Sequence, residues 1–383
     1  MLLFDLTACQ PLGNTLVSGG AVYAKIVFFA LLEREIKFKC LYDSSLMLDE
    51  EISSACTKKK LDLIDCYHVE LSQCIKSSGC HIFYSAIPYT YGRLNIKGIR
   101  FWGTIHGLRD LEIISDTKMH LYASSFADYI KLVAKETFFY KKYAKKRNYA
   151  SFKDLFENES FRYICVSEHT KYSVLSHFPH VKEDSIEVLY SPLTLTVDNN
   201  NSNDGKFFLL VSGNRWLKNS YRALLAIDSL LSEKRIDKTV VVTGSCPNAI
   251  YNKLKNKNKF DFKGYVTNEE LHQLMKDAFC LVYPSLNEGF GYPPLEAMSC
   301  GTPCVVSAVT SIPEVCGDAA LYFNPYDIDE IMVRLFQICN ASIRSLIINK
   351  GYQRADYVIK KQKRDLRRLV DILLNDNEEL SKS

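Results

Sequence analysis

The hydrophobic positions of the chain form short runs, separated by polar loops and by longer stretches with helical spacing. The runs are rich in β-favouring residues and have the length of buried strands. Short apolar strands that alternate with helices predict an α/β protein. In the first half of the chain we predict strands at Leu2–Thr7, Phe38–Asp43, Ile82–Ala86, Arg100–His106, Tyr163–Ser167 and Ile186–Tyr190.

A second series of apolar runs follows residues 191–206, a polar stretch rich in asparagine that we interpret as an interdomain linker. A chain of 383 residues has the length expected for two domains. We therefore expect a first domain at residues 1–190 and a second at residues 207–350. The strands predicted for the second domain are Phe207–Gly213, Thr239–Gly244, Phe262–Val266, Cys280–Tyr283, Pro303–Ser307 and Leu321–Phe323.

Residues 281–306 carry the most informative pattern in the chain. An apolar strand is followed by Glu288–Gly291, a loop whose glycines allow its backbone to approach a ligand closely. Pro293 and Pro294 are suited to the first turn of a helix, and Gly301 is suited to its end, where a positive φ is useful. This order of strand, glycine loop and helix predicts a binding site for an anion such as phosphate at the helix N-terminus.

Two carboxylates, Glu288 and Glu296, flank this predicted anion site, with seven residues between them. Carboxylates repel phosphate, but they accept hydrogen bonds from hydroxyl groups. The pair therefore indicates a ligand with hydroxyls on both sides of a phosphate group, such as a sugar and a ribose.

The glutamate pair and its surroundings resemble the signature of the retaining glycosyltransferases of family 4, which have the GT-B fold. Gly-Phe-Gly follows Glu288, residues 297–306 fit the text after the second glutamate, and the similarity continues through 311–315 and 317–320. The resemblance implies two Rossmann-like domains with parallel sheets that face each other across a cleft. The first domain would bind the acceptor and the second the nucleotide sugar, with residues 351–383 forming a helix that crosses back to the first domain.

The resemblance also implies roles for residues of the signature. Glu288 would hold hydroxyls of the donor sugar, and Glu296 would hold the ribose hydroxyls. Loop amides would stabilise charge on the departing diphosphate without a metal. The donor-binding residues expected in this segment are Gly289, Phe290, Gly291, Leu295 and Glu296.

The first strand of the second domain leads into a loop that carries two cations. Gly213 ends the strand, Arg215 and Lys218 follow, and a helix is predicted at Ser220–Leu231. A strand, a glycine, two cations and a helix N-terminus together indicate an anion site. The family resemblance implies that Arg215 and Lys218 contact the donor diphosphate and stabilise the leaving group.

The first domain contains two weaker signals. Gly19 and Gly20 precede a predicted helix at residues 21–34, and they resemble the glycine motif of the family that faces the donor diphosphate. His106 ends a buried strand, where ligand-facing residues of α/β sheets are found, and it matches a family position that touches the donor sugar. The apolar spacing of the helix predicts a buried face made of Val22, Ile26, Phe29 and Ala30.

The composition narrows the class of protein further. Thirteen cysteines occur without a Cys-x-x-Cys motif, which favours a reduced, cytoplasmic chain without a zinc site. Asp327 and Asp329 have the spacing of a metal motif, but we interpret them as the cap and first turn of a helix. No apolar run reaches the length of a membrane span, and the N-terminus has no basic region of a signal peptide. We expect no metal and no other cofactor.

Residues 121–147 are rich in lysine and aromatic residues. A basic, aromatic amphipathic surface is suited to contact with anionic lipid, although a solvated helix face has the same composition. No nucleic-acid motif accompanies this stretch, so we expect no nucleic-acid partner. We predict a peripheral position on the cytoplasmic face of the membrane.

The sequence thus predicts a metal-independent hexosyltransferase of bacterial surface-polysaccharide synthesis, of the O-antigen or capsule type. The donor would be a nucleotide diphosphate sugar, for which we favour UDP over GDP. The acceptor would be a saccharide on a lipid diphosphate. The alternatives are an inactive GT-B scaffold that acts as a binding or regulatory subunit, and another GT-B enzyme such as a sugar-nucleotide epimerase.

Overall fold

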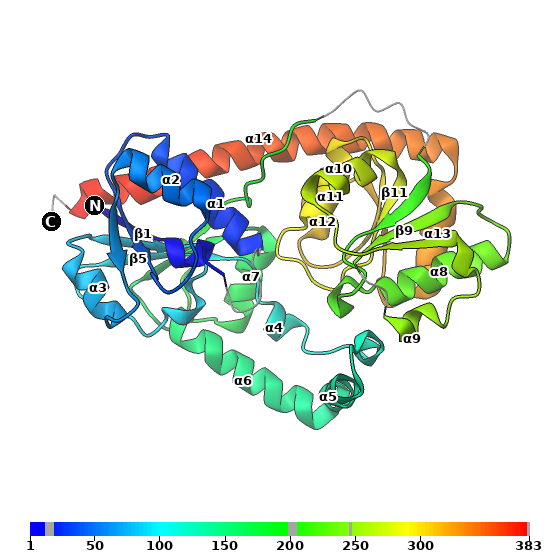
Figure 1. Ribbon diagram of the computed structural model, residues 1–383, viewed down its shortest axis with the longest axis horizontal. Coiled ribbons are helices and arrows are strands. Elements are labelled where there is room, and N and C mark those ends of the chain that lie inside the picture. Colours follow the sequence, from blue (N-terminus) through cyan, green and yellow to red (C-terminus); the bar gives the residue numbers. More distant parts are fainter. Residues whose placement is uncertain (12–18, 198–204, 245–246, 381–383) are drawn as a thin grey trace. The chain divides into compact units, whose positions relative to one another are not determined.

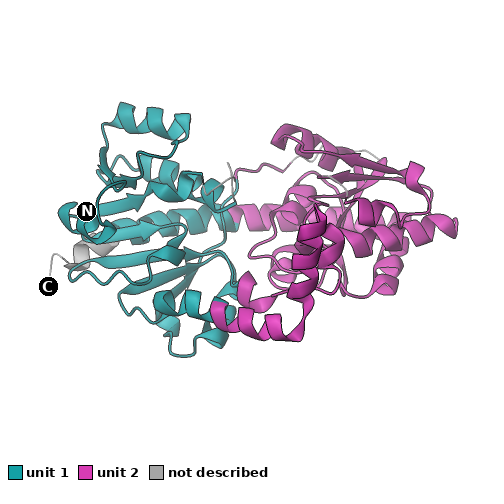
Figure 2. Ribbon diagram, turned by 60° about the horizontal axis from the view of Figure 1, so that its bottom comes forward, with its two compact units in different colours: residues 1–108, 148–193, 361–383 teal, residues 109–147, 194–360 magenta. Residues whose placement is uncertain are grey.

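The computed structural model describes residues 1–11, 19–197, 205–244 and 247–380. The chain divides into two compact units (Figure 2). Unit 1 consists of residues 1–108, 148–193 and 361–383, and unit 2 consists of residues 109–147 and 194–360. Two helices contribute residues to both units: α6 (Phe138–Phe156) and α14 (Ala341–Leu380).

The described part of unit 1 contains a seven-stranded parallel sheet with the order β3-β2-β1-β4-β5-β6-β7 (Figure 1). Its strands are β1 (Leu2–Asp5), β2 (Lys39–Tyr42), β3 (Asp62–Asp65), β4 (Ile82–Ser85), β5 (Arg100–Ile105), β6 (Phe161–Cys165) and β7 (Ile186–Val188). The helices of this unit are η1 (Leu6–Cys9), α1 (Gly19–Leu32), α2 (Glu50–Lys59), α3 (Leu71–Ser77), η2 (Pro88–Thr90), α7 (Glu168–His177) and η4 (Glu183–Ser185).

Unit 2, over its described residues, contains a six-stranded parallel sheet with the order β10-β9-β8-β11-β12-β13 (Figure 1). Its strands are β8 (Phe207–Leu210), β9 (Thr239–Thr243), β10 (Phe260–Lys263), β11 (Ala278–Tyr283), β12 (Cys304–Ser307) and β13 (Ala320–Phe323). Its helices are α4 (Arg109–Glu112), η3 (Met119–Tyr122), α5 (Phe126–Glu136), η5 (Trp216–Lys218), α8 (Ser220–Ser232), α9 (Asn248–Tyr251), η6 (Lys257–Lys259), α10 (Asn268–Asp277), α11 (Tyr292–Ser299), α12 (Ile312–Cys316) and α13 (Ile328–Ile338).

The strand order reverses once in each sheet, between β1 and β4 in unit 1 and between β8 and β11 in unit 2. In an open parallel sheet, ligands bind outside the carboxyl ends of the strands at such a reversal. In unit 2, β8 and β11 pair in parallel with Leu209 opposite Leu281. The loops that leave these two strands, at residues 211–219 and 284–291, therefore begin side by side.

The predicted alternation of strands and helices is confirmed, and every strand predicted from an apolar run overlaps an observed one. The sequence pattern missed β3, the edge strand of unit 1. Most residues of this strand are exposed, and its sequence Asp-Leu-Ile-Asp has no apolar run. An edge strand of this kind is held by backbone pairing with β2 rather than by burial of its side chains.

The predicted buried face of the first helix is wrong. The residues of α1 that are buried are Tyr23, Ala24, Val27, Phe28 and Leu31, whereas Val22 is exposed. Most positions of this helix are apolar, so the spacing of apolar residues does not distinguish one face from another. The face is selected by its neighbours, since Phe28 packs against Phe4 of β1 and against Phe38.

Helix α10 begins with a capping box. Its N-cap is Thr267, whose hydroxyl accepts a hydrogen bond from the Glu270 amide, while the Glu270 side chain accepts one from the Thr267 amide. This reciprocal capping box satisfies two amides. The predicted cap at Asp327 is confirmed, because its carboxylate accepts from the amides of Asp329 and Glu330.

Residues 109–147 belong to unit 2, although they lie inside the predicted first domain of residues 1–190. Leu121 packs in the hydrophobic core of unit 2, and Tyr122 bonds to Ser220 at the start of α8. These contacts are made between residues about a hundred positions apart, which no local pattern reports. Part of the predicted linker, residues 198–204, lies outside the described residues.

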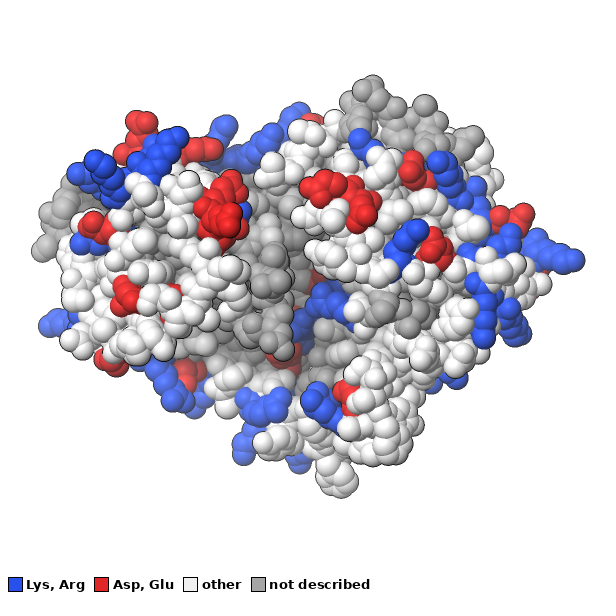
Figure 3. Space-filling model, in the orientation of Figure 1, with Lys and Arg blue, Asp and Glu red and all other residues white. Residues whose placement is uncertain are grey.

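Among the described residues, no single helix is both long and apolar enough to cross a membrane. The helices Ile328–Ile338 and Ala341–Leu374 have the required length and hydropathy only when they are taken together, and they are bent by 92° relative to each other. Charged side chains of both signs are distributed over the face shown in Figure 3. The net charge of the chain is +4.

Gly301, which follows α11, has a φ of +75°, as the sequence predicted. A Cβ at this position would overlap the hydroxyl of Tyr352 on α14. We expect Gly301→Ala to lower the free energy of unfolding by about 2–4 kcal/mol, from left-handed backbone strain and overpacking together. Thermal unfolding followed by circular dichroism measures the change.

Gly264→Ala is the matched control for Gly301→Ala. A Cβ at Gly264 meets no atom within 4 Å, and its φ is not in the left-handed region. Its thermal midpoint should equal that of the wild type. Equal midpoints for both variants would contradict the packing account of Gly301.

Candidate functional site

Three side-chain donors converge on one carboxylate oxygen at the reversal point of unit 2. Oε1 of Glu288 accepts hydrogen bonds from Lys218 Nζ at 2.5 Å, Tyr283 Oη at 2.6 Å and Ser285 Oγ at 2.5 Å. Lys218 comes from the loop after β8, and the other three residues come from the end of β11 and its loop. The strand reversal therefore brings together two of the residues predicted from separate motifs.

The protonation states in this cluster follow from its contacts. Burial by itself raises the pKa of the Glu288 carboxyl, but the charge of Lys218 and the three hydrogen bonds outweigh burial and hold that pKa below its ordinary value. Burial and the negative charge of Glu288 raise the pKa of the Tyr283 phenol well above its ordinary value. At neutral pH, Glu288 is ionised and Tyr283 is a neutral donor.

The backbone around Glu288 is held as firmly as its side chain. The Glu288 amide donates to Thr310 Oγ1 and the Glu288 carbonyl accepts from Ser311 Oγ, both at 3.0 Å. The Ser307 hydroxyl at the end of β12 donates to the Ser285 carbonyl at 2.6 Å. Hydrogen bonds of this kind keep a functional group in one geometry before a ligand arrives.

Lys218 is positioned through its neighbour Asn219, which adopts a left-handed backbone with φ of 52°. The Asn219 side chain donates to the Pro325 carbonyl at 2.7 Å and accepts from Arg222 at 2.7 Å. Arg222 in turn forms a bidentate ion pair with Asp116, at 2.9 and 3.1 Å, and both side chains are buried. This chain of contacts fixes the backbone from which Lys218 extends.

Gly213 and Arg215 occupy the loop between β8 and Lys218. The Gly213 amide donates to the Thr243 carbonyl at 2.7 Å, and a Cβ on Gly213 would meet Val242 Cγ1 at 2.5 Å, so a glycine is required there. Arg215 is exposed. Its positive charge acts on Tyr283, whose pKa it lowers, so it lies within electrostatic reach of the Glu288 cluster.

The predicted glycine loop leads into α11. Gly291 has a φ of 97° and forms the N-cap of this helix, with prolines in its first turn. The residues Phe290 and Leu295 are 5% and 0% exposed, so both are buried. At Gly289 and Gly291, which have no side chain, a ligand would meet backbone.

Glu296 differs from Glu288 in its surroundings. Burial raises the pKa of the Glu296 carboxyl to about 7. Like Glu288, it raises the pKa of Tyr283 through its negative charge, so both carboxyls lie within electrostatic reach of the same phenol. A donor of hydrogen bonds to this carboxylate would favour its ionised form.

His106 lies in unit 1, immediately after β5. Its Nε2 lies 2.9 Å from the Ala86 carbonyl oxygen, its amide donates to Tyr89 Oη, and its ring packs edge-on against Tyr23. A carbonyl oxygen only accepts, so Nε2 carries the proton and Nδ1 is left as an acceptor. Burial lowers the pKa of the His106 imidazole to about 4, so the ring is neutral at pH 7.

Gly19 and Gly20 are the first two residues of α1, also in unit 1. A Cβ at Gly19 would meet no atom within 4 Å. The loop that precedes them, residues 12–18, lies outside the described residues. The predicted site residues thus fall into two sets: Gly19, Gly20 and His106 in unit 1, and the others in unit 2.

The sequence interpretation missed Tyr283 and Ser285 as parts of the site. Tyr283 was assigned only to a strand, yet its hydroxyl accepts from Lys218 at 2.7 Å and donates to Glu288. Its place at the carboxyl end of a central strand is the signal that identifies it. Asn287, which donates to Glu112 at 2.6 Å, had no such signal, because its partner is far away in the sequence.

The described residues contain no group of three or more His, Cys, Asp or Glu side chains that could hold a metal ion. All the described cysteines are free thiols. Metal independence stays a prediction.

Residues 195–354 match the family model described as Glycosyl transferases group 1. O-antigen chain mannosyltransferase B of Escherichia coli is 47% identical over 95 residues, which are 24% of this chain and 25% of that protein. O-antigen chain mannosyltransferase RfbU of Salmonella typhimurium is 47% identical over 74 residues, 19% of this chain and 21% of that protein. The matches therefore span about a quarter of the length of these curated relatives.

Solved structures with the same architecture match nearly the whole chain. Sucrose-phosphate synthase from Thermosynechococcus elongatus has a TM-score of 0.67 at 14% identity and covers 100% of this chain and 99% of its own. WaaG, a glycosyltransferase involved in lipopolysaccharide biosynthesis, has a TM-score of 0.64 at 15% identity and covers 97% and 99%. The predicted GT-B fold and the resemblance to bacterial surface-polysaccharide glycosyltransferases are confirmed, and the part of the chain that matches the glycosyltransferase group 1 model lies in unit 2.

The ion pair between Lys218 and Glu288 makes a testable contribution to stability. Its side chains are only 13% and 16% exposed, so Lys218→Met leaves a nearly buried carboxylate without its cation. We expect a loss of about 3 kcal/mol at pH 7.5. This loss of stability should shrink as the pH falls towards 4, because Glu288 of the variant then becomes protonated and no longer carries an unpaired charge. Thermal unfolding at several pH values measures it.

The double variant Lys218→Met with Glu288→Gln is the control for this prediction. It removes both charges and should recover most of the stability lost at pH 7.5. If Lys218→Met alone is as stable as the wild type at pH 7.5, the ion pair does not stabilise unit 2.

Proposed function

We propose that this chain is a retaining glycosyltransferase that moves a hexose or an N-acetylhexosamine from a nucleotide diphosphate sugar to a saccharide acceptor. The observation that carries the proposal is the cluster of Lys218, Tyr283 and Glu288 at the strand reversal of unit 2, beside Arg215 and the N-terminus of α11. This arrangement offers cations and amides for a diphosphate, and carboxylates for hydroxyls, within one loop system.

The diphosphate of the donor would be held by Arg215, Lys218 and the amides of residues 289–295. As the bond to the sugar breaks, negative charge builds on the diphosphate oxygens. Positive charges and helix amides already in place stabilise that charge without reorganising. This proposal uses no metal ion, in line with the prediction from the sequence.

Glu288 would orient the donor sugar rather than attack it. Three donors already bind Oε1, which lowers the tendency of that oxygen to act as a nucleophile. Such a carboxylate remains a good acceptor for sugar hydroxyls. The arrangement therefore favours transfer on the face from which the diphosphate leaves, with retained configuration, over a covalent intermediate on Glu288.

Unit 1 would bind the acceptor, and His106, Gly19 and Gly20 of that unit keep the donor-contacting roles that the sequence predicts for them. The neutral His106 ring has an acceptor at Nδ1, which suits a sugar hydroxyl. The acceptor we propose is a lipid-diphosphate-linked intermediate of O-antigen or capsule synthesis. The chain would work at an anionic membrane, as a peripheral protein on its cytoplasmic face.

The names of the relatives point to the sugar to test first. Both O-antigen relatives compared above are mannosyltransferases by name. We propose a mannosyl donor as the first candidate among the hexoses. For the base of the donor we keep the expectation from the sequence, which favours UDP over GDP. A panel of donors tests this expectation directly.

Donor binding should depend on pH through Glu296. Burial raises the pKa of this carboxyl to about 7, and ribose hydroxyls bind the carboxylate better than the acid. We expect affinity for the matching nucleotide sugar to rise about tenfold between pH 6 and pH 8. Calorimetry with UDP- and GDP-sugars is suitable, since their diphosphates, unlike free nucleotides, have no terminal phosphate that titrates near pH 6.

Glu296→Gln should bind the same donor more weakly than the wild type does, and its affinity should not change between pH 6 and pH 8. Both results should be the same in the presence and in the absence of EDTA. A bound ligand at a hundred times its dissociation constant also adds about 2.7 kcal/mol of stability, so thermal shifts identify the base. If no nucleotide sugar binds, the inactive scaffold is favoured over the transferase.

Glu288→Gln should lower the rate of glycosyl transfer by about a hundredfold or more while the fold is kept. Two measurements check this: slow hydrolysis of the bound donor, which needs no acceptor, and incorporation of labelled sugar into lipid-linked saccharides. Glu269→Gln, at an exposed glutamate in α10, is the control and should keep the wild-type rate. A wild-type rate in Glu288→Gln would remove Glu288 from the mechanism, and epimerised donor in place of transfer would favour an epimerase.

A further inference from the structure

Asp5 is a buried acid at the strand reversal of unit 1, and it is not one of the predicted site residues. It ends β1, and Ser85 ends β4, the strand on the other side of the reversal. Because β1 and β4 pair in parallel with Phe4 opposite Tyr84, Asp5 and Ser85 lie side by side at the carboxyl ends of these strands. Open parallel sheets bind their ligands outside this edge. Asp5 therefore lies close to the edge at which unit 1 would bind a ligand.

The Asp5 carboxyl group accepts four hydrogen bonds. Its Oδ1 accepts from the amide and the hydroxyl of Thr7, at 3.0 and 2.5 Å. Its Oδ2 accepts from Ser85 Oγ at 2.6 Å and from Tyr91 Oη at 2.9 Å. Burial raises the pKa of the Asp5 carboxyl, and these hydrogen bonds oppose that effect. A buried acid with so many partners holds each of them in one place, because every broken bond would leave a buried polar group unsatisfied.

The segment of residues 85–91, which we call the Asp5 loop, is fastened at both ends to the same oxygen. Ser85 and Tyr91 are its first and last residues, and both donate to Asp5 Oδ2. Within the loop, Ser85 Oγ accepts from the Ile87 amide at 3.1 Å, and the Tyr91 amide donates to the Pro88 carbonyl at 3.0 Å. The conformation of the loop therefore depends on Asp5.

The middle of the Asp5 loop holds His106. The Ala86 carbonyl accepts from His106 Nε2 at 2.9 Å, and Tyr89 Oη accepts from the His106 amide at 3.1 Å. The hydrogen bond to the Ala86 carbonyl places the ring proton on Nε2, so Nδ1 is the nitrogen that can accept. The place of the Ala86 carbonyl thus decides which ring nitrogen of His106 is available to a ligand.

We propose that Asp5 is a positioning residue that acts on His106 through the Asp5 loop. By holding both ends of the loop, it keeps the Ala86 carbonyl against the imidazole and so selects the tautomer with an acceptor at Nδ1. The inference rests on the proposed function, in which Nδ1 accepts from a sugar hydroxyl. Asp5 itself is 1% exposed and touches no ligand. A group whose neighbours have all their hydrogen bonds satisfied keeps the geometry that a reaction requires.

The tautomer of His106 can be measured without any substrate. In the full chain with ¹⁵N-labelled histidines, a long-range ¹H–¹⁵N spectrum at pH 7.5 should show His106 with Nε2 protonated and Nδ1 unprotonated, its signals being assigned with His106→Gln. Asp5→Ala removes all four hydrogen bonds. Ser85→Ala removes only the hydroxyl that links Asp5 to the Ile87 amide, so it should fold even if Asp5→Ala does not. In both variants the two His106 nitrogen shifts should move towards each other, as mixed tautomers require.

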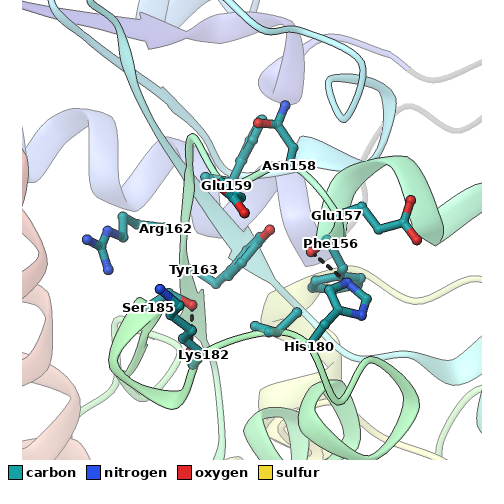
Figure 4. Close-up of a pocket in the computed structure, with 11 residues that line it drawn as sticks. Phe156, Glu157, Asn158, Glu159, Arg162, Tyr163, His180, Lys182 and Ser185 are labelled. Atoms are coloured by element: carbon teal, nitrogen blue, oxygen red, sulfur yellow. Dashed lines mark hydrogen bonds between the residues drawn. The ribbon is translucent and has the colours of Figure 1, made fainter.

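His180 is the internal control in the same spectra. Its Nε2 donates to the Phe156 carbonyl at 3.2 Å, so it makes the same kind of hydrogen bond as His106 (Figure 4, dashed line). The pocket that it lines lies where β6 and β7 begin, at the edge of the unit 1 sheet opposite to the Asp5 loop. Its nitrogen shifts should stay unchanged in both variants.

Asp365→Ala is the matched control variant. Asp365 is another buried acid of unit 1, and it accepts from the Tyr190 amide at 2.9 Å. Its loss should lower the thermal midpoint, as the loss of Asp5 should, without changing the His106 shifts. An unchanged His106 tautomer in Ser85→Ala would overturn the proposal, and so would an equal change in Asp365→Ala.

The effect on the reaction is measured separately. Incorporation of labelled sugar into lipid-linked saccharides should fall about tenfold in Ser85→Ala, because a displaced ring no longer meets the sugar hydroxyl. Binding of free UDP or GDP, which have no sugar, should stay unchanged, and Ser85→Ala should cause no further loss in a His106→Gln background. A changed tautomer with a wild-type rate would keep the link between Asp5 and His106 and would remove His106 from the proposed function.

Discussion

The ion pair between Lys218 and Glu288 joins the two loops on which the candidate site depends. One loop leaves β8 and the other leaves β11, the strands on either side of the reversal in the unit 2 sheet. Removing two charges from water is unfavourable unless further hydrogen bonds compensate. Tyr283 and Ser285 supply them at the same carboxylate oxygen. Displacing either loop would leave a nearly buried charge without a partner, so the ion pair holds both loops in place before a ligand binds.

Support for this ion pair comes from a part of the chain that is distant in sequence. Asp116 holds Arg222, which holds Asn219 beside Lys218, and Glu112 accepts from Asn287 beside Glu288. Residues 109–147 thus brace both loops, and the same segment continues into α5, none of whose residues is buried. Two features that looked separate in the sequence, a basic aromatic stretch and a pair of anion-binding loops, belong to one unit.

The sequence identified residues whose local pattern has a direct chemical meaning. The spacing of Glu288 and Glu296, and the glycines before α11, could be recognised because strand, loop and helix are consecutive there. Other features depend on contacts that no local pattern reports. The buried face of α1 is chosen by Phe4 and Phe38, and Tyr283 becomes part of the site only because β8 pairs with β11. Contacts between distant parts of the chain determine the buried face of α1 and the place of Tyr283. Local spacing was sufficient to identify the two glutamates.

The two glutamates show how one residue type serves two purposes within eight positions. Glu288 has three hydrogen-bond donors, one of which is the cation Lys218, so it stays ionised despite burial. Glu296 is buried without a cation or donors, among the described residues, that would offset the effect of burial, and its pKa rises to about 7. Environments that push two carboxyl pKa values apart assign different roles to identical groups. The fixed charge of Glu288 suits a group that must hold one geometry throughout a reaction. The adjustable charge of Glu296 suits a group that meets its hydroxyl donors only when the ligand arrives, since hydrogen bonds to the carboxylate then favour its ionised form.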